Sequence, residues 1–223
     1  CGGKIDGYQK IIDGAQQVVE NYKPAIKIDP EWEKVELSEL CEFKSGGTPS
    51  KANKTYWKGV IPWVSPKDMK TDYLLDTIDH INEEAINKSA TSLVPSNTIL
   101  IVVRSGILKH SIPISITSKA MSFNQDITAL IPDENKLLYK FLSTYLQYKE
   151  KFILTNGIKT GVSVQSFRAG YLKRFQIPLP SLPTQQEIVT QIEAEQEIVN
   201  ANKKLIEIYE QKIKDKIGEV WGE

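Results

Sequence analysis

Ile177-Pro178-Leu179-Pro180 interrupts the chain, and a continuous helical pattern then runs from Thr184 to Trp221-Gly222-Glu223. This last quarter has no proline after Thr184 and no glycine before Gly218. Its apolar residues recur at steps of three and four with polar gaps, the period of a helix face that packs along another helix. They are Ile188, Ile192, Val199, Ile206, Tyr209, Ile213 and Val220. At 1.5 Å per residue, about 35 residues form a rod of roughly 50 Å. We therefore expect a spacer or dimerisation arm.

The composition is ordinary for a globular protein. With 223 residues, 40% hydrophobic and 25% charged, the chain is long enough for one or two domains. The longest apolar run, residues 98–104, is too short to span a bilayer, and the polar N-terminal segment does not resemble a signal peptide. Cys1 and Cys41 are too few for a disulfide framework or a zinc site, so we expect a cytoplasmic location. Because the chain begins at Cys1 without a methionine, we interpret it as a fragment or processed piece.

The charge is unevenly distributed although the net charge is zero. Residues 183–223 carry nine acidic side chains against five lysines, whereas residues 100–182 carry eleven basic side chains against four acidic ones. A basic block on a neutral chain is compatible with a phosphate-binding face. Lysines that only keep a surface soluble would give the same count, so charge alone does not decide the function.

The segments before the long helix read as a helix followed by a mixed domain. Residues 1–24 show helical spacing up to Pro24, and Pro30 favours an extended linker after it. In the domain we predict strands at residues 60–64, 98–103, 112–116, 126–131 and 175–179. We predict helices at residues 38–41, 83–87, 137–152 and 166–172. The predicted fold class is α+β: one mixed α/β domain flanked by long helices that pair as an antiparallel coiled coil.

Known catalytic motifs are missing from the sequence. His80 and His110 have no nucleophile or metal-ligand partner at a useful spacing, so we predict neither a catalytic nor a metal site. Gly46-Gly47 is not followed by the Lys-Ser/Thr of a phosphate-binding P-loop, and no dinucleotide-binding or methyltransferase signature occurs. These absences favour a non-catalytic binding module.

Three motifs follow one another from the start of the domain to the start of the long helix. The first is Trp32-Glu33-x-Val35-x-Leu37, and the second is Ser45-Gly46-Gly47-Thr48-Pro49-Ser50 followed by Tyr56-Trp57-x-Gly59-x-Ile61-Pro62-Trp63-Val64. The third is Ile177-Pro178-Leu179-Pro180-Ser181-Leu182-Pro183-x-Gln185-Gln186-x-Ile188-Val189. Together these motifs resemble one known family, the specificity subunit of type I restriction-modification systems. The tail from Ala201-Asn202-x-x-Leu205-Ile206 to Trp221-Gly222-Glu223 also resembles the family's conserved helical region. The order and spacing of the motifs agree with that family.

This resemblance implies a division of the chain and a set of partners. Residues 1–24 would be a truncated spacer helix, residues 25–183 one target-recognition domain, and residues 184–223 the conserved long helix. The chain resembles half a specificity subunit, which would form a homodimer or pair with a second recognition domain. It would read half of a bipartite target in double-stranded DNA and bind modification (methyltransferase) subunits, and through them the restriction subunit. S-adenosylmethionine and ATP would bind to those partners, and no cofactor is expected here.

Polar loop residues are the candidates for DNA contact. We expect Arg104, which follows an apolar strand, to read a base, and Lys159, between Gly157 and Gly161, to contact a phosphate. A purely structural role competes for the motif loop, and Trp57 and Trp63 are expected to be core residues. The candidates are Thr48, Ser50, Lys51, Asn53, Lys54, Lys67, Arg104, Ser105, Lys109, His110, Lys159, Thr160, Ser163 and Gln165.

Two other functions remain open at this point. The chain could be the recognition end of a fused restriction-modification methyltransferase polypeptide that continues before Cys1. It could also be a coiled-coil scaffold whose α/β domain binds protein rather than DNA. Upstream sequence would separate the first alternative from a free-standing subunit, and a test for salt-dependent DNA binding would separate the second.

Overall fold

The helical pattern after Pro180 forms one helix, α6 (Leu182–Trp221), in a computed structural model that describes residues 2–159 and 164–221. Pro183 lies in the first turn of α6, where its missing N–H has no helical partner to lose. The chain divides into two units. The helical unit contains residues 1–26 and 187–223, and the domain contains residues 27–186.

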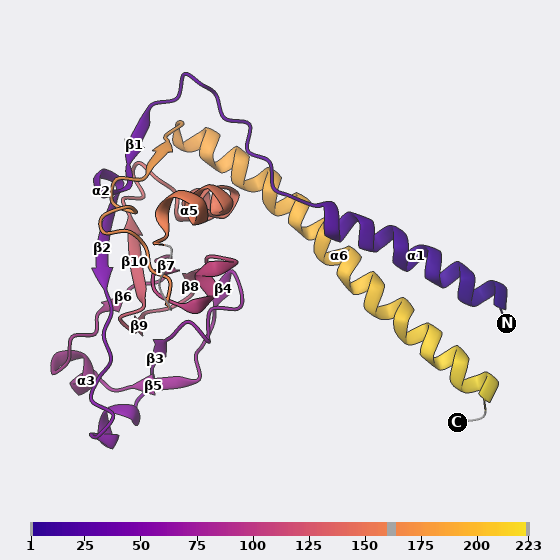
Figure 1. Ribbon diagram of the computed structural model, residues 1–223, viewed down its shortest axis with the longest axis horizontal. Helices are drawn as coiled ribbons and strands as arrows, with labels where there is room; N and C mark the ends of the chain where they lie inside the picture. The colour runs from indigo at the N-terminus through magenta and orange to yellow at the C-terminus, as the bar shows by residue number, and fades with distance from the viewer. Residues whose placement is uncertain (1, 160–163, 222–223) are drawn as a thin grey trace. The chain divides into compact units, whose positions relative to one another are not determined.

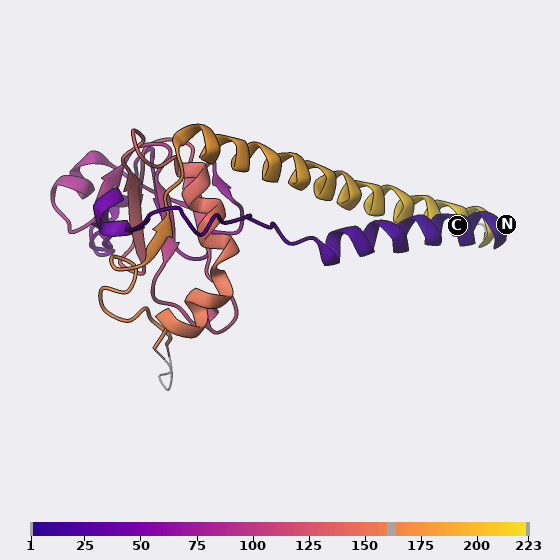
Figure 2. The same ribbon diagram turned by 90° about the horizontal axis from the view of Figure 1, so that it is seen from above.

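In the helical unit, α1 (Gly2–Asn21) lies alongside α6, as Figures 1 and 2 show. The ring of Tyr8 lies 5.3 Å from that of Tyr209, measured between centroids, and the Nζ atom of Lys212 lies 4.4 Å from the Tyr209 ring centroid. Near the other end of α1, burial and the nearby Glu195 carboxylate raise the pKa of Tyr22. The start of α1 therefore faces the later part of α6.

The predicted apolar face of α6 is only partly covered. Ile192 and Val199 are buried, whereas the other described members of that face are half-buried; they are Ile188, Ile206, Tyr209 and Ile213. The side chain of Val220 lies outside the described residues.

The first and last motifs meet in a two-stranded antiparallel sheet. β1 (Lys34–Glu36) pairs with β11 (Gln176–Pro178), and α2 (Leu37–Leu40) follows β1 directly. The fully buried Gln185 fixes the C-terminal motif: its Oε1 accepts the Leu138 N–H at 2.9 Å, and its Nε2 donates to the carbonyl oxygens of Lys136 and Pro180. Because a buried amide must be satisfied, this arrangement gives the glutamine of that motif a structural role.

A five-stranded sheet forms the centre of the domain. All four residues of its middle strand, Ile99–Val102, are completely buried, as their β-branched and aliphatic side chains predict. The predicted strand at residues 98–103 is thus confirmed. The strand order is β2 (Cys41–Ser45), β10 (Ile127–Pro132), β7 (Ile99–Val102), β8 (Ile114–Thr117) and β4 (Tyr73–Leu74).

A four-stranded sheet holds the second motif. Trp63 is buried, its Nε1 donates to the Gly47 carbonyl at 3.0 Å, and its ring meets the Trp57 ring edge-on at 5.0 Å. Trp63 therefore belongs to the core, as predicted, and the half-buried Trp57 packs against it. Pro62 does not break strand β3, because β3 pairs with β9 only from the next residue, Trp63. The missing N–H of Pro62 is therefore not needed for that pairing. The strand order is β5 (Asp79–Ile81), β3 (Ile61–Val64), β9 (Met121–Phe123) and β6 (Leu93–Val94), with η1 (Lys54–Trp57) and α3 (Glu83–Asn87) packed beside it.

Two sequence predictions need correction. The helix predicted at residues 137–152 is two helices, α4 (Tyr139–Tyr148) and α5 (Glu150–Gly157), because Lys149 leaves the helical region with φ −90° and ψ 4°. Residues 166–172 form no helix. Instead, Ser166 bridges to Arg104 and Phe167 to Ile158, so this segment is held by long-range pairing that local periodicity does not reveal.

Candidate functional site

Several of the predicted DNA-contact loops meet at one edge of the five-stranded sheet. The register pairs Ser45 with Thr128 and Val102 with Ile127, so β2 and β7 end where β10 begins. β8 also begins at this edge, after the short helix η2 (Gly106–Lys109). The tertiary structure therefore brings together loops that lie more than fifty residues apart in sequence.

Arg104 is fixed at this edge by Asp126. The Arg104 Nε lies 2.6 Å from the Asp126 Oδ1, and the Asp126 carbonyl accepts the backbone N–H groups of Val103 and Arg104. The guanidinium does not project freely, since one of its nitrogens is held in this ion pair. The Arg104 side chain is nevertheless 54% exposed, against 23% for Asp126, so it remains at the surface.

The last loop is joined to the same edge through its backbone. The N–H of Ser105 donates to the Gln165 carbonyl at 3.0 Å, and the N–H of Lys159 donates to the Ser166 carbonyl at 2.8 Å. Lys159 is exposed, but Gln165 is buried, so its side chain is not presented on the surface. The predicted contacts Thr160 and Ser163 lie outside the described residues.

The Gly-Gly motif loop is packed tightly against the neighbouring sheet. A Cβ atom at Gly46 would lie 2.2 Å from the Asn124 carbonyl oxygen, and one at Gly47 would lie 2.6 Å from the Ala90 carbonyl carbon. Only glycine permits this approach of two backbones. The structural role that the sequence left open for this motif is thus supported by its packing.

The polar residues after the motif divide into anchored and exposed groups. Thr48 donates to Gln125 Oε1 at 2.6 Å, and Asn53 caps η1 by accepting the Thr55 N–H. Ser50, Lys51 and Lys54 are exposed on this loop. Thr48 therefore joins the motif to Gln125, the neighbour of Asp126, and extends the polar edge.

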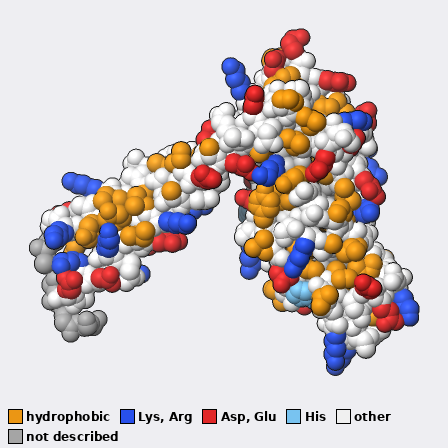
Figure 3. Space-filling model, turned by 180° about the vertical axis from the view of Figure 1, so that it is seen from behind, with side chains coloured by type: hydrophobic (Ala, Val, Ile, Leu, Met, Phe, Trp, Pro, Cys, Tyr) orange, Lys and Arg blue, Asp and Glu red, His pale blue; other side chains and the backbone are white. Residues whose placement is uncertain are grey.

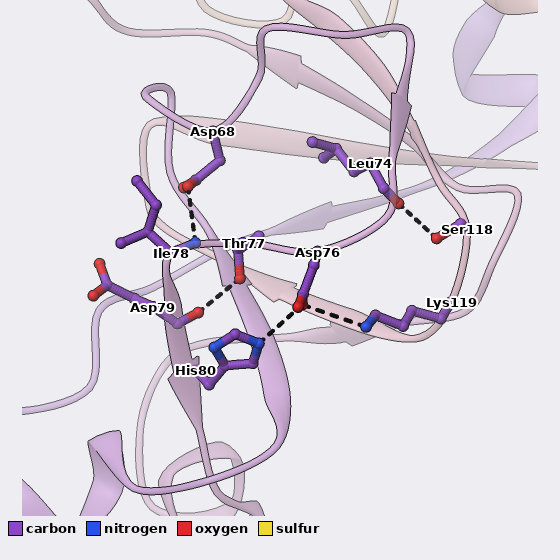
Figure 4. A network of polar contacts seen from close by, with 9 residues as sticks. All are labelled: Asp68, Leu74, Asp76, Thr77, Ile78, Asp79, His80, Ser118 and Lys119. Carbon is purple, nitrogen blue, oxygen red and sulfur yellow. Dashed lines mark hydrogen bonds and ion pairs between the residues drawn. The ribbon is translucent and has the colours of Figure 1, made fainter.

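Lys67 belongs to another polar network, whose remaining members are drawn in Figure 4. Its Nζ lies 2.9 Å from Asp79 Oδ2, and this hydrogen bond raises the pKa of Lys67. In the same loop, Asp76 Oδ1 binds His80 at 2.9 Å and Lys119 at 3.3 Å. These contacts hold the loop between β4 and β5 in place.

On η2, Ser105 is the N-terminal cap, and Lys109 and His110 are exposed.

A groove of about 340 Å³ runs beside Arg104. Three cationic side chains line it, those of Arg104, Arg168 and Lys173, and the described lining residues include no carboxylate. Tyr171 forms part of the wall of the groove. Burial raises the pKa of Tyr171, although the positive charge of Arg168 acts in the opposite direction. The lining consists of Phe43, Val103, Arg104, Gln125, Thr128, Ser166, Phe167, Arg168, Ala169, Gly170, Tyr171, Leu172 and Lys173.

Arg168, Lys173 and Gln125 were not among the candidates selected from the sequence. Arg168 and Lys173 belong to the basic block of residues 100–182, but their common position became visible only in the fold. On the domain face shown in Figure 3, cationic and acidic side chains are interspersed. The carboxylate-free lining identifies the groove.

Comparison with known proteins assigns the chain to a family. Residues 30–211 match the family described as Type I restriction modification DNA specificity domain. The chain belongs to this type I DNA specificity family. It is 42% identical over 154 residues to the Escherichia coli Type I restriction enzyme EcoR124I/EcoR124II specificity subunit. That alignment covers 69% of this chain and 38% of the relative. The Methanocaldococcus jannaschii MjaIX specificity subunit is 28% identical, covering 82% of this chain and 42% of the relative. The chain thus spans about two fifths of the length of these specificity subunits.

Solved structures of this family have the same fold. A chain from a structure of type I R-M system assembly gives a TM-score of 0.71 at 20% identity, covering 96% of this chain and 53% of that one. The HsdS subunit from Thermoanaerobacter tengcongensis gives a TM-score of 0.61 at 20% identity, covering 95% of this chain and 51% of that one. Since both structures match about half of their own length, this chain corresponds to half of each fold.

Neither a membrane-spanning helix nor a metal-binding cluster occurs in the described part of the chain. No helix there is long and apolar enough to cross a membrane. No three or more His, Cys, Asp or Glu side chains are placed there to hold a metal ion.

Proposed function

We propose that this chain is the target-recognition half of a type I specificity subunit and binds duplex DNA along the Arg104–Lys173 groove. The observation that carries the proposal is the meeting of separate loops at one sheet edge around a cationic, carboxylate-free groove. This edge lies within the segment that matches the DNA specificity family. Cations bind the phosphate backbone, and side chains on rigid loops are suited to reading base edges.

The groove offers both kinds of contact. Arg104 is the proposed base reader, because Asp126 and the backbone orient a guanidinium that can bind guanine O6 and N7. Lys159, Arg168 and Lys173 are the proposed phosphate contacts, which add affinity without sequence information. Because the chain is neutral and the groove small, we expect the isolated chain to bind DNA weakly and with a steep dependence on salt.

The helical unit would set the distance between two recognition domains. In this proposal α1 and α6 form an antiparallel coiled-coil spacer that joins a second copy or a second recognition domain, so that two half-sites are read at a fixed spacing. The modification subunits would bind here, and catalysis, S-adenosylmethionine and ATP would belong to the partner subunits. The support for this role is the apolar surface that α6 leaves half-covered.

The test is a methylation footprint of the complex reconstituted with modification subunits. We expect the double variant Arg168→Ala, Lys173→Ala to weaken DNA binding about equally on all sequences and to flatten the salt dependence. Lys136→Ala is the matched control, because Lys136 lies beyond Pro132, where β10 leaves the opposite edge of the sheet. Unchanged affinity in the double variant, or equal losses in the control, would contradict a DNA-binding groove.

A further inference from the structure

A second and larger cavity of about 620 Å³ lies in the domain between the β1–β11 sheet and helices α4 and α5. Lys34, Gln176 and Pro178 contribute the sheet side, and Tyr145, Phe152 and Asn156 contribute the helical side. This volume is in the range of small-molecule sites. Tyr171 lines both this cavity and the DNA groove, so the two sites lie on either side of one segment.

Aromatic rings form the apolar part of the cavity. Phe175 is buried, and its ring lies 6.5 Å from Tyr145, 6.5 Å from Phe152 and 5.9 Å from Tyr171, measured between centroids. Phe152 is 57% exposed, which is unusual for a phenylalanine and leaves much of its ring available to a ligand. A flat ring entering this cluster would find aromatic faces and edges to stack against.

Cations surround these rings without an acidic neighbour in the cavity. Lys34, Lys149 and Arg174 are among the lining residues, and none of the described lining residues is a carboxylate. The Nζ atom of Lys149 lies 4.8 Å from the Tyr148 ring centroid and 5.8 Å from that of Tyr145. A cation that rests on aromatic rings gains more from an incoming anion than one already paired with a carboxylate.

The geometry points to a binding site for a nucleotide, with its base among Phe152, Tyr171 and Phe175 and its phosphate near Lys149 and Arg174. The side-chain amides of Asn156 and Gln176 supply the donors and acceptors that a base edge requires. The ligand can be a free nucleoside monophosphate or one unpaired nucleotide of a strand, since both present the same base and phosphate.

An acidic peptide fits these surroundings less well. Its backbone would place N–H and C=O groups over an aromatic wall that cannot satisfy them, whereas a base confines its polar atoms to its edge. The inference does not depend on the DNA groove, because duplex binding and nucleotide binding use different side chains.

The experiment is calorimetric titration of the full chain with dAMP, dTMP, inorganic phosphate, a single-stranded pentanucleotide, its abasic counterpart and the peptide Glu-Phe-Glu. We expect Phe152→Ala to weaken nucleotide binding by roughly tenfold, as the loss of one stacking partner does. Lys149→Gln should weaken binding and reduce its salt dependence. Both residues lie at the surface of the cavity, and equal melting temperatures of the variants would show that the fold is intact. Lys173→Gln, in the DNA groove, is the control and should leave dAMP binding unchanged.

The outcomes separate this site from the proposed function. Tighter binding of dAMP than of the pentanucleotide would identify a free nucleotide as the ligand. Tighter binding of the pentanucleotide would identify an unpaired nucleotide of a strand instead. The inference is overturned if dAMP does not bind, if phosphate or the abasic strand binds equally well, if the peptide Glu-Phe-Glu binds more tightly, or if Phe152→Ala has no effect. Loss of duplex methylation in the Lys173 variant with intact dAMP binding would separate the two sites.

Discussion

The domain and the helical unit use their apolar residues in opposite ways. In the domain, the whole of β7 is buried, and the rings of Trp57 and Trp63 pack against each other. In the helical unit, Ile12, Ala15 and Val199 are buried, but Ile198 and Ile208 are 59% and 51% exposed. The domain thus contains a fully buried core, although Leu75 and Phe152 are exposed on its surface, whereas the helices bury only part of their apolar residues.

This difference fits the two tasks proposed above for the domain and the helical unit. A domain that reads bases needs side chains held by a closed core, because a shift of the loops would change the hydrogen bonds to the bases. A spacer needs only a reproducible length, and it can complete its apolar packing with a partner.

Removing core volume from the domain should have the largest effect. Leu100→Ala, in a completely buried site of β7, should lower the free energy of unfolding by about 2–5 kcal/mol, because the lost contacts leave a cavity. Leu75→Ala makes the same change at a residue that is 71% exposed and should cost less than about 0.5 kcal/mol. Urea denaturation followed by tryptophan fluorescence measures both. Similar losses in the two variants would mean that the domain lacks a closed core.

Placing charge on the exposed helix residues should act on association instead. Ile198→Glu with Ile208→Glu should shift the protein from dimer to monomer, since each carboxylate buried in an interface costs at least about 1–3 kcal/mol. Light scattering at micromolar concentration measures the mass, and Glu197→Gln with Glu207→Gln is the control pair on the same helix. A wild-type chain that is monomeric and fully helical by circular dichroism would refute the dimer.

Arg104 and Lys159 should separate base reading from phosphate binding. Arg104→Ala should relax the methylated consensus at one position, where a bidentate contact discriminates by about 1–3 kcal/mol. Lys159→Ala should weaken binding on all sequences and reduce the salt slope. The melting temperature supplies the check: because the Arg104–Asp126 pair is partly exposed, its loss should cost at most about 1 kcal/mol. A lowered melting temperature with an unchanged consensus would make Arg104 purely structural.

The smallest effect should come from acid, at the loop of Figure 4. The hydrogen bond to His80, followed by contacts with Thr77 and Lys119, lowers the pKa of Asp76 below its ordinary value of about 3.9. The stabilisation is therefore complete above about pH 4 and is lost as the pH falls through the folded-state pKa. The urea midpoints of wild type and Asp76→Asn should differ near neutral pH and converge in acid. A constant difference down to about pH 2.5 would contradict this account.

Local pattern predicted the elements whose own residues specify them. The helix at residues 83–87 was predicted with the observed bounds, and the strand at residues 98–103 contains β7. The long C-terminal helix was predicted to within two residues of its start. Strands such as β4, β6 and β9 were missed, because two or three residues are too few to show a period, and their pairing partners lie far along the chain.

The sequence by itself determined the family motifs, the rod-like period of α6 and the glycine pair Gly46-Gly47, because each is written in neighbouring residues. Only the tertiary structure decided that Arg104 pairs with Asp126, that Gln165 is buried, and that Arg168 and Lys173 share one groove. Such proximities depend on strand register and loop closure, which sum contacts over the whole domain. Side chains selected one by one from their local pattern could not reveal them.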